Sequence, residues 1–116
     1  MMKKETFEAI ASILGNGYTC FVNKKTEEVF SAEAISLAEQ KSTEYQTFEP
    51  LEGKLVFGMM KAFTDSVEDF SNQSELMEAL TFEQPFSNFK RKVYQIHLAD
   101  EWIAFRNQKI VELLMG

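Results

Sequence analysis

The second half of the chain carries apolar residues at helical spacing almost without interruption. From Leu55 onward, bulky apolar side chains recur every three or four residues, which is the period of one helix face. A helix with such a stripe must bury it against another element, so this half of the chain is expected to form packed helices. The first stripe consists of Val56, Met59, Met60, Phe63, Val67 and Phe70.

Start signals divide this half into further helices. Asn72 suits an N-cap because Glu75 follows three residues later, and Pro85 suits the first position of a helix. We expect the further helices at about 73–80, 85–96 and 100–114. The helix at 85–96 would bury Phe86, Phe89 and Val93. The last helix carries the apolar residues Trp102, Ile103, Phe105, Ile110, Leu113 and Leu114.

The first half of the chain alternates between helical and β-rich stretches. Lys4 to Leu14 places its apolar residues on one helix face, and Gly15 suits the left-handed position that ends a helix. Tyr18 to Val22 and Glu28 to Phe30 flank a short polar loop. This arrangement predicts a β-hairpin.

The loop of this hairpin makes a specific backbone prediction. In a type I turn followed by a bulge, the last loop residue has positive φ, and Glu27 holds that position. A Cβ in the left-handed region costs roughly 1 kcal/mol. The sequence therefore predicts that Glu27→Gly stabilises the protein by several tenths to ~1 kcal/mol, less the added entropy of the unfolded chain.

The remaining signals complete the expected architecture. Ser31 suits the N-cap of a helix to about Lys41, and Tyr45 to Glu49 is a candidate third strand that Pro50 ends, with a turn at Gly53. No repeat and no linker-like segment interrupts the chain. The prediction is one α+β domain, 1–116. Its small antiparallel sheet, a β-hairpin plus a possible third strand, would pack against a mainly helical C-terminal half.

Charge and cysteine content narrow the classes of protein. The chain carries 12 basic and 18 acidic residues, a net charge of −6, and this balance opposes general binding to nucleic acid. Its one cysteine cannot form an internal disulfide, which favours a cytoplasmic location. No apolar run approaches the ~18 residues of a membrane span, and the acid-containing N-terminus is not typical of a signal peptide. We therefore expect no membrane partner.

One basic cluster is the candidate nucleic-acid site. Lys90, Arg91 and Lys92 are consecutive, and Tyr94 shares a helix face with Lys90. Consecutive helix residues are about 100° apart, so the three charges fan out instead of forming one stripe. A solvated set of charges on a core helix explains the cluster as well as a phosphate-binding or base-stacking role does.

The last helix offers a second candidate site. Trp102, Phe105 and Arg106 lie at i, i+3 and i+4, so they share a helix face. Tryptophan and arginine are enriched among residues that dominate binding energy at protein interfaces. The alternative is that both aromatic residues anchor the core and that Arg106 extends from it to solvent or to an acidic partner.

Catalytic and metal-binding patterns are weak. Cys20 and His97 are the only thiol and the only imidazole, and a nucleophile pair needs them in contact. Cys20 lies among apolar residues, where a small buried side chain is the usual role. Acidic pairs at helical spacing occur routinely on solvated faces, and no paired cysteine or histidine spacing is present. We expect no cofactor and no metal.

Four stretches of the sequence are similar to one known family. The most specific is the closing run Asp100-Glu101-Trp102, continued by Phe105-Arg106. On these stretches the chain, over about residues 4–114, resembles the bacterial uncharacterised protein family 0158, whose biochemical function is not established. The resemblance implies a fold and a bacterial setting but no reaction. The other stretches are Tyr18–Val29, with Asn23-Lys24-Lys25-Thr26; Met59 or Met60 with Phe63, Ser66 and Val67; and Phe86 with Phe89 and Lys90.

The chain departs from the family at several positions. Glu27 stands where the family has glycine, and two further glycines correspond to Phe82 and Gln84. Two arginines of the family correspond to Ser87 and Asn88. The resemblance therefore implies a divergent member. Any family site that used those glycine amides and arginines to hold an anion would be largely lost here.

Together these patterns predict a non-enzymatic, macromolecule-binding domain of the cytoplasm, and the resemblance implies a bacterial setting. A protein partner would bind an aromatic or acidic surface, with Trp102, Phe105 and Arg106 as candidate residues. The first alternative is a nucleic-acid-associated protein that uses Lys90, Arg91, Lys92 and Tyr94. The second alternative is a small hydrolase that uses Cys20 and His97.

Overall fold

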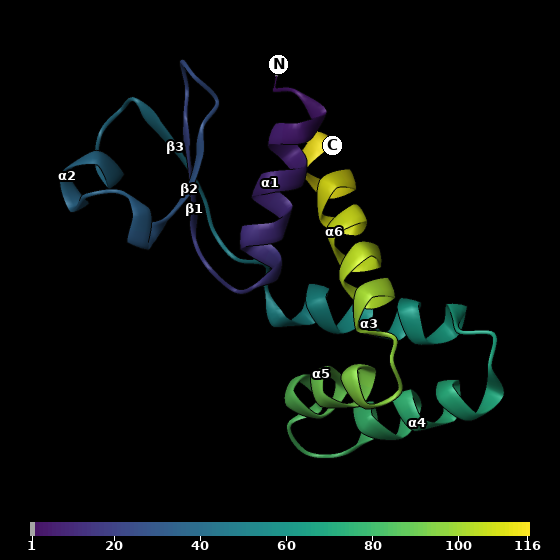
Figure 1. The fold of residues 1–116 in the computed structure, drawn as a ribbon. Coiled ribbons are helices and arrows are strands. Elements are labelled where there is room, and N and C mark those ends of the chain that lie inside the picture. Colours follow the sequence, from purple (N-terminus) through teal and green to yellow (C-terminus); the bar gives the residue numbers. More distant parts are fainter. Residues whose placement is uncertain (1) are drawn as a thin grey trace. The chain divides into compact units, whose positions relative to one another are not determined.

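The computed structural model describes residues 2–116, which form two compact units. The sheet unit comprises the residues up to 51 together with 107–116, and the helical unit comprises residues 52–106. The α+β class is confirmed, with a small antiparallel sheet and a helical C-terminal half. Figure 1 shows the elements, which are α1 (Lys4–Gly15), β1 (Cys20–Asn23), β2 (Val29–Ser31), a 3₁₀ turn η1 (Ala32–Ala34), α2 (Leu37–Gln40), β3 (Tyr45–Phe48), α3 (Gly53–Ser66), α4 (Phe70–Thr81), α5 (Pro85–Gln95) and α6 (Ala99–Met115).

The sheet has three antiparallel strands in the order β2-β1-β3. Phe21 in the central strand β1 is opposite Phe30 in β2 and Thr47 in β3, so the predicted hairpin and third strand both form. Three consecutive residues of β1, Cys20, Phe21 and Val22, are buried instead of alternating, so both faces of this central strand are covered. The helix against β1 and β2 is α1, whose buried stripe consists of Phe7, Ile10, Ala11 and Leu14.

The end of α1 differs from the sequence prediction by two residues. Gly15 is still helical, and Gly17, with φ of 86°, takes the left-handed position. The Gly17 amide donates to the Leu14 carbonyl at 3.0 Å, and the Tyr18 amide donates to the Ile13 carbonyl at 3.2 Å. This is the Schellman pattern, in which the left-handed residue follows the C-cap. The C-cap is Asn16, which leaves the second glycine to make the turn.

The helix predicted from Ser31 to Lys41 is wrong, because the segment forms two short pieces. The 3₁₀ turn η1 ends at Ala34, and Ile35 after it is extended, with φ and ψ of −131° and 154°. Ser36 then starts α2: its hydroxyl accepts from the Glu39 amide at 3.1 Å, and its amide donates to the Glu39 carboxylate at 3.0 Å. This capping box starts a helix at Ser36, which a continuous helix would not allow.

The boundary between α3 and α4 also differs from the prediction. Gly53 lies in the first turn of α3 instead of making a separate turn, and the helix ends at Ser66, before Val67 turns extended. Asp69 is the N-cap of α4, since its carboxylate accepts from the Asn72 amide at 2.8 Å. Phe70 thus belongs to α4. It is 80% exposed, so its predicted place in the apolar stripe of the preceding helix is wrong.

An aromatic cluster forms the core of the helical unit. Phe63 of α3, Phe89 of α5 and Trp102 of α6 meet edge to face, with ring centroids 5.0 to 6.4 Å apart. Trp102 is only 6% exposed, so its predicted burial against the Phe63 and Phe89 helices is confirmed. The predicted burial of Phe86 is wrong: it is 44% exposed, because only Phe89 and Val93 of α5 face the core.

Candidate functional site

The two residues of the possible nucleophile pair have unsuitable environments. Cys20 is fully buried in β1, and burial raises the pKa of its thiol to about 11. The thiol is therefore protonated at neutral pH, whereas nucleophilic cysteines act as thiolates. His97 is exposed and has a φ of 62° just after α5, where its amide donates to the Tyr94 carbonyl. These environments give no support to cysteine-based hydrolysis.

The basic cluster divides along α5. Lys90 and Arg91 are exposed, whereas Lys92 is half-buried and pairs with Glu75 of α4 at 3.7 Å. The Arg91 guanidinium donates to Asn88 Oδ1 at 3.3 Å. The three charges therefore fan out around α5 instead of forming one stripe. This is the arrangement that their consecutive positions predict. Tyr94, on the same helix, is 56% exposed.

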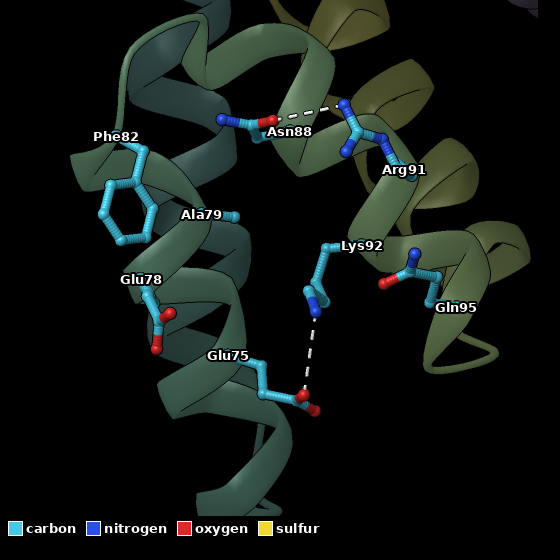
Figure 2. A pocket seen from close by; sticks show the side chains of 8 residues that line it. All are labelled: Glu75, Glu78, Ala79, Phe82, Asn88, Arg91, Lys92 and Gln95. Carbon is cyan, nitrogen blue, oxygen red and sulfur yellow. Dashed lines mark hydrogen bonds and ion pairs between the residues drawn. The ribbon is translucent and has the colours of Figure 1, made fainter.

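Arg91 and Lys92 line a cleft of about 350 Å³ between α4 and α5. Figure 2 shows both basic side chains on α5, with Glu75 and Glu78 on the opposing α4 and Phe82 at one end. Two acidic and two basic side chains face the same space, so their fields oppose each other at any ion placed there. This cleft is not an electrostatic trap for an anion.

Two of the three candidate residues in α6, Trp102 and Phe105, pack against the aromatic core. Trp102 lies in the aromatic core, and the Phe105 ring packs against Phe63 at a centroid distance of 5.4 Å. Arg106 is half-buried, and this burial lowers the pKa of its guanidinium. A binding role for these three residues stays a prediction.

An apolar groove that the sequence patterns did not predict lies between α3 and α4. Phe57 and Thr64 of α3 face Met77 and Leu80 of α4 around a cleft of about 290 Å³. Thr64 is 1% exposed, and its hydroxyl donates to the Met60 carbonyl. Its one buried polar side-chain group is therefore already hydrogen-bonded within α3. The remaining lining residues are Lys61, Asp65 and Thr81.

Apolar side chains extend this groove on both sides. The Phe57 ring contacts the Phe86 ring of α5 edge to face, at 6.3 Å between centroids. Phe70 precedes Met77 by seven residues, so both project from one face of α4. Met77 is 53% exposed and Phe86 is 44% exposed. Several large apolar side chains thus lie close to one concave part of the surface, whereas exposed apolar residues are usually scattered singly. We call Phe57, Phe70, Met77, Leu80 and Phe86 the α3–α4 surface.

One sequence signal could have located this surface. Leu76 and Ala79 of α4 are buried, at 0% and 6% exposure, and they define the inward face of the helix. Met77 and Leu80 lie one position further along, and Phe70 lies seven residues before Met77. A helix with apolar residues on both faces is more apolar than burial on one side requires, so the second face is a candidate interface.

Acidic residues predominate in the stretch of sequence that includes α4. From residue 62 to residue 89 every charged side chain is acidic. Asp65, Glu68 and Asp69 are exposed around the start of α4, and Glu78 and Glu83 are exposed along and beyond it. Lys61 is the one basic residue in the lining of the groove.

Among residues 2–116, no three His, Cys, Asp or Glu side chains converge in a way that could hold a metal ion. No helix in that part of the chain has the length and apolar character needed to cross a bilayer.

Comparison of the chain with models of protein families, with curated proteins and with solved structures gives no match. The resemblance to family 0158 therefore stays a prediction. Two positions where that family has glycine, here Glu27 and Gln84, have φ of 62° and 57°, the conformation that favours glycine. The third, Phe82, has φ of −87° and needs no glycine.

Proposed function

We propose that this protein is a non-enzymatic, protein-binding domain of the bacterial cytoplasm. The observation that carries the proposal is the α3–α4 surface, where exposed Met77 and Phe70 extend an apolar groove. Leaving such side chains in water forgoes roughly 1.5–3 kcal/mol for each one that could be buried. A partner that covers them recovers that free energy.

The chemistry of the groove favours a protein partner over a small molecule. A small-molecule site encloses its ligand and directs several polar groups at it. Here the Thr64 hydroxyl is already bonded to the Met60 carbonyl, and the walls are Phe57, Met77 and Leu80. Methionine adapts to varied apolar surfaces, a property that suits binding of a partner side chain.

The two alternatives have weaker support. Lys92 of α5 pairs with Glu75, so only Lys90 and Arg91 of the basic cluster are left to contact the phosphates of a nucleic acid. Hydrolysis needs a thiolate at Cys20, whose pKa is raised by burial to about 11. Iodoacetamide should therefore label Cys20 in the unfolded chain and not in the folded one. Rapid labelling of the folded protein would favour the hydrolase.

A peptide-display selection tests the proposed function. Random peptides selected on the wild-type protein should bind Leu37→Gln equally well and should lose binding to Met77→Gln. Leu37 is the matched control because it is an exposed apolar residue in the sheet unit, 72% exposed against 53% for Met77. Selected peptides that bind both variants alike would contradict a binding role for the α3–α4 surface.

A further inference from the structure

We infer that Asn16-Gly17 is a site of spontaneous modification, at which Asn16 deamidates to aspartate or isoaspartate only when the last turn of α1 opens. Asn16 is the one asparagine of the chain that a glycine follows. Glycine has no Cβ, so its backbone nitrogen is the least hindered that a following residue can offer. Both residues are exposed, so water reaches them.

The reaction needs only these two residues and water. The Gly17 backbone nitrogen loses its proton to hydroxide and attacks Cγ of the Asn16 side chain. The new N–Cγ bond closes a succinimide ring, and the side-chain nitrogen leaves as ammonia. Water then opens the ring at one of its two carbonyl groups. Opening at Cγ gives aspartate, and opening at the main-chain carbonyl gives isoaspartate, whose main chain is longer by one methylene.

The backbone of the folded turn directs the attacking nitrogen away from its target. Asn16 has φ of −87° and ψ of 4°. At this ψ the Gly17 nitrogen eclipses the backbone nitrogen of Asn16. Ring closure needs it to eclipse Cβ instead, because Cβ and Cγ both belong to the ring. The Cα–C bond of Asn16 must therefore rotate before the ring can close.

Hydrogen bonds hold the turn in this unreactive conformation. The Gly17 amide, whose nitrogen must attack, donates to the Leu14 carbonyl at 3.0 Å. The Asn16 amide donates to the Ser12 carbonyl at 3.2 Å. An amide that donates a hydrogen bond loses its proton less readily, since the bond stabilises the protonated form. Rotation about the Asn16 Cα–C bond moves the Gly17 amide off the Leu14 carbonyl, so the turn must open before Asn16 reacts.

The end of a helix is a place where local opening costs little free energy. The folded protein should therefore react at the rate of the open turn multiplied by the fraction of time that the turn is open. Either product loosens the turn further. Aspartate adds a negative charge at the negative end of the α1 dipole, and isoaspartate displaces the Gly17 amide from its acceptor.

Mass spectrometry of the aged protein tests the site. The protein is incubated at mildly alkaline pH, either folded or unfolded in guanidinium chloride, and is then digested into peptides. In the unfolded chain Asn16 should convert faster than the other asparagines, and its peptide should separate into aspartate and isoaspartate forms on chromatography. In the folded protein conversion of Asn16 should be at least about tenfold slower. Equal rates in the two states would overturn the inference.

Substitutions at Ser12 test whether opening of the turn controls the rate. Ser12 is exposed in α1, and its carbonyl accepts from the Asn16 amide. Alanine favours the helix and glycine disfavours it, so folded Ser12→Gly should convert about fourfold faster than folded Ser12→Ala. Both variants should convert at the wild-type rate once unfolded. Equal rates for the two folded variants would contradict control by the turn.

A matched pair in the helical unit separates local opening from a general loss of stability. Ser74 is exposed in α4, so Ser74→Ala and Ser74→Gly make the same change in helix preference away from α1. These two variants should convert Asn16 at equal rates when folded. If Ser74→Gly speeds the conversion as much as Ser12→Gly does, Asn16 reacts through unfolding of the whole protein and the inference fails.

Discussion

Within residues 2–116, three residues other than glycine hold left-handed backbone conformations, and each does so in a different local setting. Glu27 ends the hairpin loop, Gln84 precedes Pro85, and His97 follows α5. At His97 the pattern is the same Schellman arrangement that Gly17 completes after α1. The His97 amide donates to the Tyr94 carbonyl at 3.2 Å, and the Leu98 amide donates to the Val93 carbonyl at 2.8 Å.

We predict that His97→Gly stabilises the protein by several tenths to ~1 kcal/mol. Glycine removes the Cβ strain of the left-handed conformation, and this gain exceeds the added entropy of the unfolded chain. His97→Ala is the control, because it removes the imidazole and keeps the strain. A urea denaturation midpoint that rises for glycine and not for alanine would bear this out. A lower midpoint for glycine would show that the imidazole itself stabilises the fold.

The side chain of Glu27 modifies what its backbone alone predicts. Its carboxylate accepts from the Lys3 amide at 3.0 Å and from the Thr6 hydroxyl at 2.9 Å, so it joins the hairpin loop to the start of α1. Glu27→Gly relieves the strain but loses both hydrogen bonds. The stabilisation predicted from the sequence is therefore offset, and Glu27→Gly should raise stability less than His97→Gly does.

These hydrogen bonds also make a pH-dependent prediction. The Lys3 amide, followed by the Thr6 hydroxyl, lowers the pKa of Glu27 below its ordinary value. A depressed carboxyl pKa adds stability that is present above the unfolded pKa of about 4.3 and is lost as pH falls through the folded value. Glu27→Gln should flatten the loss of stability in that acidic window. Unfolding midpoints measured from neutral pH down to acid test this, with Glu28→Gln as the control. Parallel curves for wild type and Glu27→Gln would contradict it.

At the scale of elements, helix packing in the helical unit depends on Trp102. The indole of α6 contacts the rings of Phe63 in α3 and Phe89 in α5, at 5.6 and 5.0 Å between centroids. One side chain thus joins three helices.

We predict that Trp102→Ala costs ~3–5 kcal/mol of unfolding free energy, because it removes a large buried side chain and leaves a cavity. The matched control is Phe70→Ala, since Phe70 is an aromatic residue of the same unit that is 80% exposed. Thermal and urea unfolding should show a large loss for the first variant and little change for the second. Intact stability of Trp102→Ala would contradict its place in the core.

At the scale of the whole molecule, the dominant property is charge. The net charge is −6, and residues 41–82 contribute −5 of it. Every charge from residue 62 to residue 89 is acidic, whereas the lining of the apolar groove holds one basic and one acidic residue, Lys61 and Asp65. The mildly basic end of the chain, residues 83–116, carries only +1. Charge therefore favours basic partners over phosphate backbones.

We predict that the protein binds nucleic acid no more tightly than about 10⁻⁴ M at physiological salt. Lys92 pairs with Glu75, so Lys90 and Arg91 are left to contact phosphates from α5. Fluorescence anisotropy with short single-stranded RNA and with duplex DNA, near about 150 mM salt, tests the prediction. Sub-micromolar binding that disappears in Lys90→Glu/Lys92→Glu would contradict it and support the nucleic-acid alternative.

Short-range chemistry made the elements predictable from the sequence alone. Helix periodicity placed α1, α5 and α6 within a residue or so at each end, and turn chemistry predicted the hairpin and the positive φ of Glu27. Errors fell where two local signals compete. Gly17 rather than Gly15 takes the left-handed position after α1. The reciprocal hydrogen bonds of Ser36 and Glu39 start a new helix within a segment whose composition favours one continuous helix.

Which apolar side chains remain exposed was decided only by the tertiary structure. Phe86 and Phe89 both lie in α5 and are equally apolar, yet Phe89 is 0% exposed and Phe86 is 44% exposed. The same holds for Leu76 and Met77 of α4, at 0% and 53%. The sequence shows apolar residues on two faces of α4 but not which face is covered, because burial depends on which face of a helix its neighbours cover. Helical periodicity specifies the faces, and only packing selects between them.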